Sequence, residues 1–324
     1  MGRLSATVTK IVGNESEVED DQGRTLRCDL RGRLFRRKRV RLAVGDRVEV
    51  ELVEGEPPAS EEDPPAEARG VIEAVRPRRN AMHRARDFKR DQVVCANVDQ
   101  VLLVVAAFDP PYKRAFIDRV LVGLERDGIE ACVVINKIDL ADAEYRAFVE
   151  EDGEVYRRLG YRVLLVSAAS GEGLEALRAL MTGSLSAVVG PSGVGKSTLL
   201  NVLFPGVRLR TGEVSEADGR GRHTTTSAEL IRLEGGGWVV DTPGLRAFGL
   251  WDLDLEELKQ GFRELVELAP SCKFRDCAHN AEPKCAVRAA VEAGTVDEER
   301  YESYLKLRDD ALASEAERQA ARRR

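Results

Sequence analysis

The chain has 324 residues, of which 43% are hydrophobic and 33% are charged, a composition that suits a globular protein of two or three domains. No apolar run approaches the roughly 18 residues of a membrane-spanning helix, and the N-terminus lacks the apolar core of a signal peptide, which argues against membrane and secreted classes. We therefore expect a cytoplasmic protein with no membrane attachment. The net charge of -6 conceals a strongly basic N-terminal part.

Residues 1–90 contain short strand patterns separated by turn signals, which predict a small β-barrel of the oligonucleotide-binding (OB-fold) kind. Nine Lys and Arg residues between Arg24 and Arg41 face a single acid, Asp29, and a second basic stretch runs from Arg76 to Arg90. A solvated charged face is one interpretation. Two basic runs on a small barrel within an acidic protein favour RNA instead, because RNA presents a phosphate backbone. The acidic, proline-rich residues 54–68 are typical of an insertion without catalytic role.

Residues 91–250 alternate strand and helix patterns, which predicts a mostly parallel α/β sheet with helices on both faces. The strand patterns cover 98–107, 131–135, 162–166, 187–189 and 238–240, and the helical patterns cover 116–124, 145–159 and 174–180. Cys95 and Cys132 are expected in or beside this core as small apolar groups.

A glycine-rich loop, Gly190 to Ser197, follows the strand pattern 187–189 and opens a helical pattern, as a phosphate-binding loop does. Glycines at 190 and 195 let backbone N–H groups approach phosphate oxygens at a helix N-terminus. Lys196 would reach the terminal phosphates and Ser197 would offer its hydroxyl to Mg²⁺. An ordinary glycine-rich turn is the alternative, but the flanking strand and helix argue against it.

Two further loops predict a guanine site. Asn136-Lys137-Ile138-Asp139 follows the second strand, and the Asp139 carboxylate can accept two hydrogen bonds from an edge of guanine that adenine does not offer. Asn136 and Lys137 would steady the loop and stack along the base, and the backbone of Ser167-Ala168, after the third strand, would contact the guanine carbonyl. Asp139 therefore argues against the weaker alternative, an ATPase.

A switch-like element, Asp241-Thr242-Pro243-Gly244, follows the strand pattern 238–240. Asp241 can hold Mg²⁺ through water, and the Gly244 N–H can sense the terminal phosphate. Residues 219–226 offer a threonine to Mg²⁺, and we favour Thr225 over Thr224.

The C-terminal part, residues 251–324, carries Cys272-x4-Cys277-x-His279-x5-Cys285. Three thiolates and an imidazole match a closed tetrahedral Zn²⁺ site with a structural role, and soft sulfur ligands disfavour Mg²⁺ and Ca²⁺. Buried cysteines beside an incidental histidine are the alternative. We expect a mainly α zinc-binding domain in which the metal holds together a segment with little core of its own.

The order of these motifs is unusual, because the guanine loop precedes the phosphate loop, and this order indicates a circular permutation. With the basic barrel and the Cys/His cluster, it resembles the bacterial ribosome small subunit-dependent GTPase A family. The resemblance implies a protein that binds the small ribosomal subunit and its rRNA late in assembly and, when stimulated by it, hydrolyses GTP to GDP and phosphate. It places zinc on the four cluster residues, guanine on Asn136, Lys137 and Asp139, and phosphate on Gly190, Pro191, Ser192, Gly193, Val194, Gly195, Lys196, Ser197 and Thr198.

Leu245 stands where many GTPases have a water-orienting glutamine, so slow intrinsic hydrolysis is expected. We hypothesise that His223 assists Lys196 and Thr225 in catalysis when the subunit orders its segment, the alternative being a contact with RNA. We expect a monomer that uses Mg²⁺ with GTP. The competing function is an RNA-binding assembly scaffold in which nucleotide only orders the domains.

Overall fold

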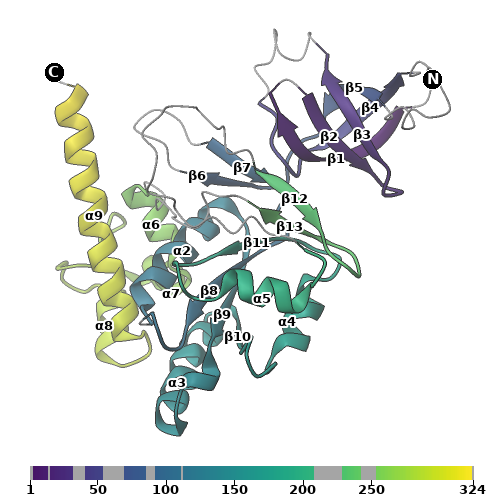
Figure 1. Ribbon diagram of the computed structural model, residues 1–324. Coiled ribbons are helices and arrows are strands. Elements are labelled where there is room, and N and C mark those ends of the chain that lie inside the picture. Colours follow the sequence, from purple (N-terminus) through teal and green to yellow (C-terminus); the bar gives the residue numbers. More distant parts are fainter. Residues whose placement is uncertain are drawn as a thin grey trace, which may run out of the picture.

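A computed structural model describes residues 3–13, 15–31, 41–53, 69–84, 92–110, 112–207, 228–241 and 253–322. Figure 1 shows a barrel near the N-terminus, a central sheet with helices around it, and a group of C-terminal helices on the side away from the barrel. This is the predicted multidomain arrangement. Both predicted domain boundaries, after residues 90 and 250, fall outside the described ranges, as does the predicted insertion 54–68.

The N-terminal barrel has five strands that close in the order β1-β2-β3-β5-β4-β1, with β3 and β5 parallel and the other pairs antiparallel. Alternate side chains of each strand point inward and form a core of small apolar residues, which is why the strand patterns were readable in the sequence. The predicted oligonucleotide-binding type of barrel is confirmed. Its strands are β1 (Arg3–Val12), β2 (Glu15–Asp20), β3 (Thr25–Leu30), β4 (Arg47–Val53) and β5 (Arg69–Val75).

Several arginines of the barrel are engaged by carboxylates, so part of the predicted basic charge is compensated within the protein. Arg24 lies 2.7 Å from Asp20, Arg76 lies 3.7 Å from Glu49, and Arg31 pairs with Glu73. Residues 32–40, which hold five Lys and Arg residues and no acid, lie outside the described ranges.

The central sheet runs β10-β9-β8-β11-β13-β12, with all pairs parallel except β12–β13. After β10 the chain crosses back over β8 to form β11, and this reversal of direction is the point where open α/β sheets bind ligands at the carboxyl ends of their strands. The predicted parallel sheet is confirmed. Its strands are β8 (Gln100–Ala106), β9 (Glu130–Asn136), β10 (Arg162–Leu165), β11 (Leu185–Val189), β12 (Glu229–Arg232) and β13 (Trp238–Asp241).

Helices cover both faces of this sheet, so its strands are buried on both sides. In β8, Val101, Leu103 and Val105 join the core under α2 (Arg114–Asp127) and α3 (Ala143–Arg158). The residues between them, Leu102 and Val104, join a separate core under α4 (Leu174–Met181) and α5 (Lys196–Leu203). Cys95 and Cys132 are buried in these cores, as predicted.

The barrel and the central sheet are joined through β12, a strand that the sequence did not reveal. Lys10 of β1 pairs with Glu229 of β12, and their side chains form an ion pair at 2.9 Å. A second connection is the hairpin of β6 (Ala81–Arg84) and β7 (Gln92–Ala96), since the Ala96 N–H donates to the Val44 carbonyl at 2.8 Å. The central sheet is therefore continuous with the barrel through the pairing of β12 with β1.

The C-terminal helices pack against α2, on the side of the sheet away from α5 (Figure 1). They are α6 (Leu255–Gly261), α7 (Arg263–Leu268), α8 (Ala286–Glu292) and α9 (Glu298–Arg322), with a short 3-10 turn, η2 (Ala269–Ser271), after α7. Asp254 and Glu257 form a capping box at the start of α6. Within the described ranges, no helix combines the length and the apolar character needed to span a bilayer.

A buried ionic cluster fixes α9 to the central unit. The Arg300 guanidinium, 1% exposed, lies 2.7 Å from Asp118 of α2 and 2.5 Å from Glu264 of α7. Tyr156 of α3 also donates its hydroxyl to Asp118 at 2.9 Å. Helices α2 and α7 therefore both pair with the cation on α9, and α3 joins the cluster through Asp118.

Replacing Arg300 with alanine is expected to destabilise the protein by roughly 3–5 kcal/mol, because it leaves two carboxylates buried without their cation. By differential scanning fluorimetry the unfolding midpoint should fall by roughly 6 °C or more. Arg288→Ala is the matched control, since that side chain is 41% exposed and its guanidinium lies 3.9 Å from Glu292. Equal midpoints for the two variants would show that the cluster adds no stability.

Candidate nucleotide site and candidate metal centre

The phosphate-type loop lies at the carboxyl end of β11 and leads directly into α5, whose first residue is Lys196. Gly190 has φ +153°, and a Cβ there would lie 2.0 Å from the Val104 carbonyl oxygen, so only glycine fits beside β8. The Lys196 ammonium bends back over the loop and donates to the carbonyls of Gly190 at 2.7 Å and Pro191 at 2.5 Å. The loop therefore has the strand, turn and helix context that phosphate binding requires.

A Gly195→Ala variant is expected to bind GDP at least roughly tenfold more weakly. Gly195 has φ +91°, a region that costs an L-residue about 1–2 kcal/mol. The new Cβ would also lie 2.4 Å from the Asn136 amide nitrogen. Isothermal titration calorimetry with GDP checks this, with Gly206→Ala as control because a Cβ there meets nothing within 4 Å. Matching affinities for the two variants would contradict a phosphate role for this loop.

Asn136 joins three loops at the carboxyl edge of the sheet. It is the last residue of β9 and is buried. Its amide nitrogen donates to the Val194 carbonyl of the phosphate-type loop at 2.9 Å, and its amide oxygen accepts from the Ala168 N–H at 3.3 Å. The predicted guanine and phosphate loops, far apart in the sequence, are thus held together by one side chain.

Asp139 lies in the short 3-10 turn η1 (Ile138–Leu140) that follows β9, and its side chain is exposed. One carboxylate oxygen accepts from the Ser167 hydroxyl at 2.5 Å. The same hydroxyl oxygen accepts from the N–H groups of Ala169 and Ser170 at 3.1 and 3.0 Å, which sets the turn after β10. The structure therefore brings together Asp139, Ser167 and Ala168, the residues singled out for reading the base.

The neighbouring Lys137 has a left-handed backbone, φ +63°, and its ammonium donates to the Asp109 carbonyl. This contact ties the guanine loop to the loop that follows β8. The sequence did not indicate it, because Asp109 contributes only its backbone and any residue could do so.

The predicted Mg²⁺ residues Ser197 and Asp241 reach the same edge of the sheet. Ser197 is the second residue of α5, and Asp241 is the last residue of β13, the parallel neighbour of β11. The other predicted switch and catalytic residues, His223, Thr224, Thr225 and Gly244, lie outside the described residues, as does Leu245.

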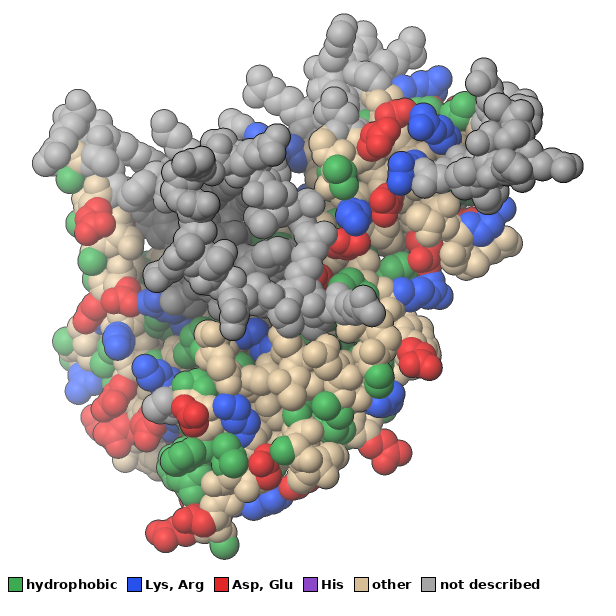
Figure 2. Space-filling model, in the orientation of Figure 1, with side chains coloured by type: hydrophobic (Ala, Val, Ile, Leu, Met, Phe, Trp, Pro, Cys, Tyr) green, Lys and Arg blue, Asp and Glu red, His purple; other side chains and the backbone are tan. Residues whose placement is uncertain are grey.

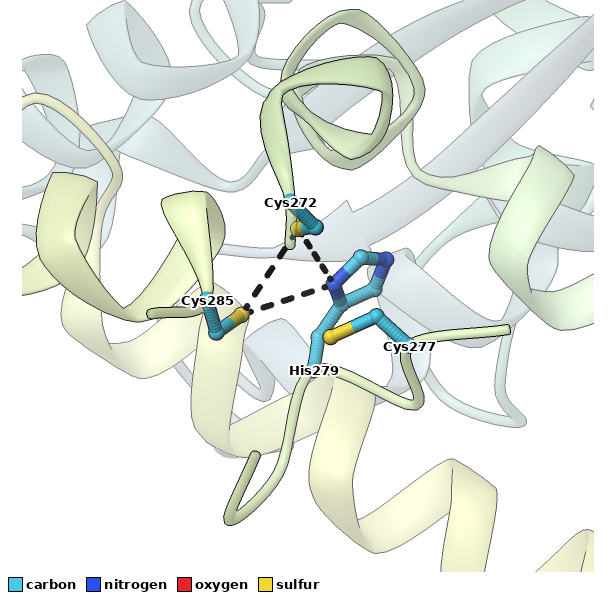
Figure 3. A group of neighbouring side chains, drawn as sticks. All are labelled: Cys272, Cys277, His279 and Cys285. Atoms are coloured by element: carbon cyan, nitrogen blue, oxygen red, sulfur yellow. Dashed lines mark hydrogen bonds between the residues drawn. The ribbon is translucent and has the colours of Figure 1, made fainter. Parts of the chain in front are cut away.

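The Cys/His cluster lies between η2 and the start of α8, beside α9 (Figure 3). Cys272 Sγ and Cys285 Sγ lie 3.5 and 3.6 Å from His279 Nδ1, and the two sulfurs are 3.9 Å apart. A tetrahedral Zn²⁺ with usual bond lengths would place such ligand atoms about 3.6–3.8 Å apart. With Cys277, all four ligand atoms lie within 4.8 Å of one another, so the cluster fits one tetrahedral ion.

Burial shapes the protonation of the ligands. It lowers the pKa of His279, with Lys259 adding to the effect, and neutral imidazole is the form that binds metal. Burial also raises the pKa of the Cys277 thiol to about 12, so an ion has to displace a proton there. The donor set therefore suits a cation that binds thiolate strongly, as zinc does.

Three side chains support the ligand loop, a role that no sequence pattern indicated for any of them. Tyr301 and Tyr304 of α9 donate their hydroxyls to the carbonyls of His279 and Ala278, each at 2.8 Å. Although burial opposes it, hydrogen bonds from the backbone N–H groups of Ala278, Asn280 and Ala281 hold the pKa of Glu282 at about 2. The role of Glu282 depends on how the loop folds, so its spacing in the sequence carries no signal.

The loops at the carboxyl edge of the central sheet define the class of protein to which this chain belongs. A phosphate-type loop after β11, a guanine-type loop after β9 and the order of strands together make this chain a circularly permuted P-loop GTPase with an oligonucleotide-binding barrel and a C-terminal metal-ligand cluster.

Comparison with known proteins gives the family. Residues 75–251 match the family model described as RsgA GTPase. The "small ribosomal subunit biogenesis GTPase RsgA" of Chlorobaculum parvum is 44% identical over 314 residues, covering 94% of this chain and 97% of the relative. The protein of the same name from Moorella thermoacetica is 44% identical over 312 residues, covering 96% and 99%. The chain therefore belongs to the RsgA GTPase family.

Solved structures agree with this assignment. YjeQ from Thermotoga maritima matches with a TM-score of 0.78 at 38% identity, and the match covers 96% of this chain and 99% of the YjeQ chain. YloQ, described as a circularly permuted GTPase, matches with a TM-score of 0.75 at 29% identity, and the match covers 97% of this chain and 96% of the YloQ chain.

Proposed function

We propose that this GTPase acts in late maturation of the small ribosomal subunit, binds the subunit and its rRNA, and hydrolyses GTP to GDP and phosphate when the subunit stimulates it. The observation that carries the proposal is the junction at Asn136, whose side chain joins the loop after β9 to the loops of Ala168 and Val194 at one edge of the sheet. Relatives named for small subunit biogenesis, similar over nearly their whole length, support the cellular role. The proposal places the chain in the cytoplasm as a monomer.

In this proposal the nucleotide lies along the carboxyl edge of the sheet. Asp139 reads the guanine amino and ring N–H groups, Asn136, Lys137, Ser167 and Ala168 hold the base, and Gly190 to Thr198 surround the phosphates. Gly244 senses the terminal phosphate. Lys196 neutralises charge on the phosphate oxygens as the bond to the leaving group breaks. Ser197, Thr225 and Asp241 would hold Mg²⁺, which when bound supplies further charge stabilisation.

The three-domain division follows from the same proposal. Residues 1–90 form the RNA-binding barrel, 91–250 the GTPase domain and 251–324 the zinc-binding helical domain. The phosphate backbone of rRNA is the partner for the basic barrel, including the run of five Lys and Arg residues at 32–40. Cys272, Cys277, His279 and Cys285 hold one structural Zn²⁺ per chain, and the separations of their ligand atoms support this.

The test is GTP turnover by the full chain with and without purified small subunits. We expect slow hydrolysis by the chain alone and a large stimulation by the subunit. The competing scaffold function, in which nucleotide only orders the domains, predicts equal rates in the two conditions.

The catalytic role of His223 is tested in the same assay. His223→Ala should retain subunit binding and lose most of the stimulation if the imidazole acts in hydrolysis. Stimulated turnover at the wild-type rate would remove His223 from the catalytic set, and reduced subunit affinity with normal turnover at saturation would assign it to RNA contact.

A further inference from the structure

An exposed aromatic patch lies beside the guanine-type loop and has no role in the site described above. Phe108, in the loop after β8, is 55% exposed, and Phe148 of α3 is 51% exposed. The ring of Tyr145 lies between them, with ring centres 6.1 Å from Phe108 and 5.8 Å from Phe148. Leu140, at the end of η1, is 54% exposed. We call Phe108, Leu140, Tyr145 and Phe148 the α3 patch.

The clustering is unusual for the described surface. Two of the three exposed phenylalanines in the described ranges belong to the α3 patch, the third being Phe274 in the metal-ligand loop. Figure 2 shows hydrophobic side chains gathered over the α3 region. Single exposed apolar residues are ordinary, but a contiguous group of large ones marks an interaction site.

Charge around the α3 patch selects the kind of partner. Exposed carboxylates adjoin its residues along the chain, and they are Asp109, Asp142, Glu144 and Glu151; Glu150 is paired with Arg146, and Asp139 accepts from Ser167. Two nearby cations are engaged, since Arg146 pairs with Glu150 at 3.2 Å and with Glu172 at 2.5 Å, and the Lys137 ammonium donates to the Asp109 carbonyl. An acidic rim repels a phosphate backbone, and it repels a second copy of itself.

We propose that the α3 patch docks a basic segment of a protein, with apolar side chains seated on Phe108 and Phe148 and Lys or Arg side chains facing the acidic rim. This combination of an aromatic centre and a charged rim is the usual anatomy of a protein interface. The inference rests on the proposed function, because it places the basic segment on a protein of the small subunit.

One hydrogen bond and one sequence neighbour place this surface next to the nucleotide loops. Phe108 precedes Asp109, whose carbonyl receives the Lys137 ammonium, and Leu140 follows Asp139. A segment docked here would touch the residues adjoining the base-reading carboxylate, while the barrel remains available for rRNA.

The experiment replaces Phe148 with p-benzoyl-L-phenylalanine and irradiates the full chain bound to purified small subunits with a nonhydrolysable GTP analogue. We expect a crosslink to a Lys- and Arg-rich segment of one subunit protein, identified by mass spectrometry. The same crosslinker at Val266, an exposed apolar residue of α7 outside the patch, should not give this product. A crosslink from position 148 to rRNA or to a second copy of the chain would overturn the proposal.

A binding measurement gives an independent result. The double variant Phe108→Ser, Phe148→Ser should bind small subunits roughly tenfold more weakly while GDP affinity and unstimulated hydrolysis stay at wild-type values, and Val266→Ser should match the wild type throughout. If the double variant binds subunits as the wild type does, the α3 patch is not a docking site and the proposed function stands. If the wild type itself neither binds subunits nor is stimulated by them, the proposed function fails and this inference fails with it.

Discussion

An Asp139→Asn variant is expected to lose roughly 10²–10⁴-fold in affinity for GDP, because each of two hydrogen bonds from guanine to the carboxylate is worth about 1.5–3 kcal/mol. In asparagine an NH₂ group replaces one carboxylate oxygen, so a hydrogen-bond donor takes the place of an acceptor. That donor would face the guanine amino group, which is also a donor. Xanthine carries a carbonyl at that position, so the variant should prefer xanthosine diphosphate. Titration calorimetry with both nucleotides measures the reversal.

The matched control is Asp142→Asn, three residues further along. Asp142 caps α3 by accepting from the Tyr145 N–H at 2.8 Å, and asparagine caps helices equally well. This variant should therefore keep wild-type preference for GDP. If Asp139→Asn also keeps that preference, or if the wild type binds ADP as tightly as GDP, the assignment of the base-reading carboxylate is wrong.

The second large effect is expected at the metal cluster, where Cys277→Ser should remove the ion and loosen the C-terminal helices. Structural zinc sites contribute an apparent 10–16 kcal/mol of binding free energy at neutral pH, and that energy goes into folding. The ligand loop is also held by Tyr301 and Tyr304, so its loss should reach α9. Mass spectrometry measures the metal content of the full chain. Limited proteolysis of the full chain measures how readily residues 253–322 are cleaved.

Cys285→Ser serves as a second variant in case three remaining ligands still retain the ion. Cys132→Ala is the matched control, because Cys132 is a buried residue of β9 and lies outside the cluster. It should keep one zinc per chain and wild-type resistance to protease. One zinc per chain in both serine variants would contradict the four-ligand assignment.

Local chemistry explains why so much of this fold was predictable. The barrel strands alternate apolar and polar residues, and β8 is a continuous apolar run because both of its faces are covered. The loop from Gly190 to Ser197 and the cluster from Cys272 to Cys285 each bring their functional groups together within a few residues, so their spacing alone indicates the chemistry. The circular permutation was visible in the order of the motifs.

Other features depend on partners that are distant in the chain. Strand β12 has only four residues, and it is a strand because β13 and β1 pair with its two edges. Arg300 is polar and sits in a helix that looks exposed by composition, yet it is buried because Asp118 and Glu264 meet it there.

The sequence by itself therefore determined the elements that lie within a short stretch: the phosphate-type loop, the loop of Asp139, the Cys/His cluster and the strands of the barrel. Only the tertiary structure decided how these parts are joined, through Asn136 between three loops, β12 between sheet and barrel, and Arg300 between helices. The physical reason is that burial and long-range hydrogen bonds are properties of the packed chain. The residues that contact a side chain in the fold cannot be deduced from the residues beside it in the sequence.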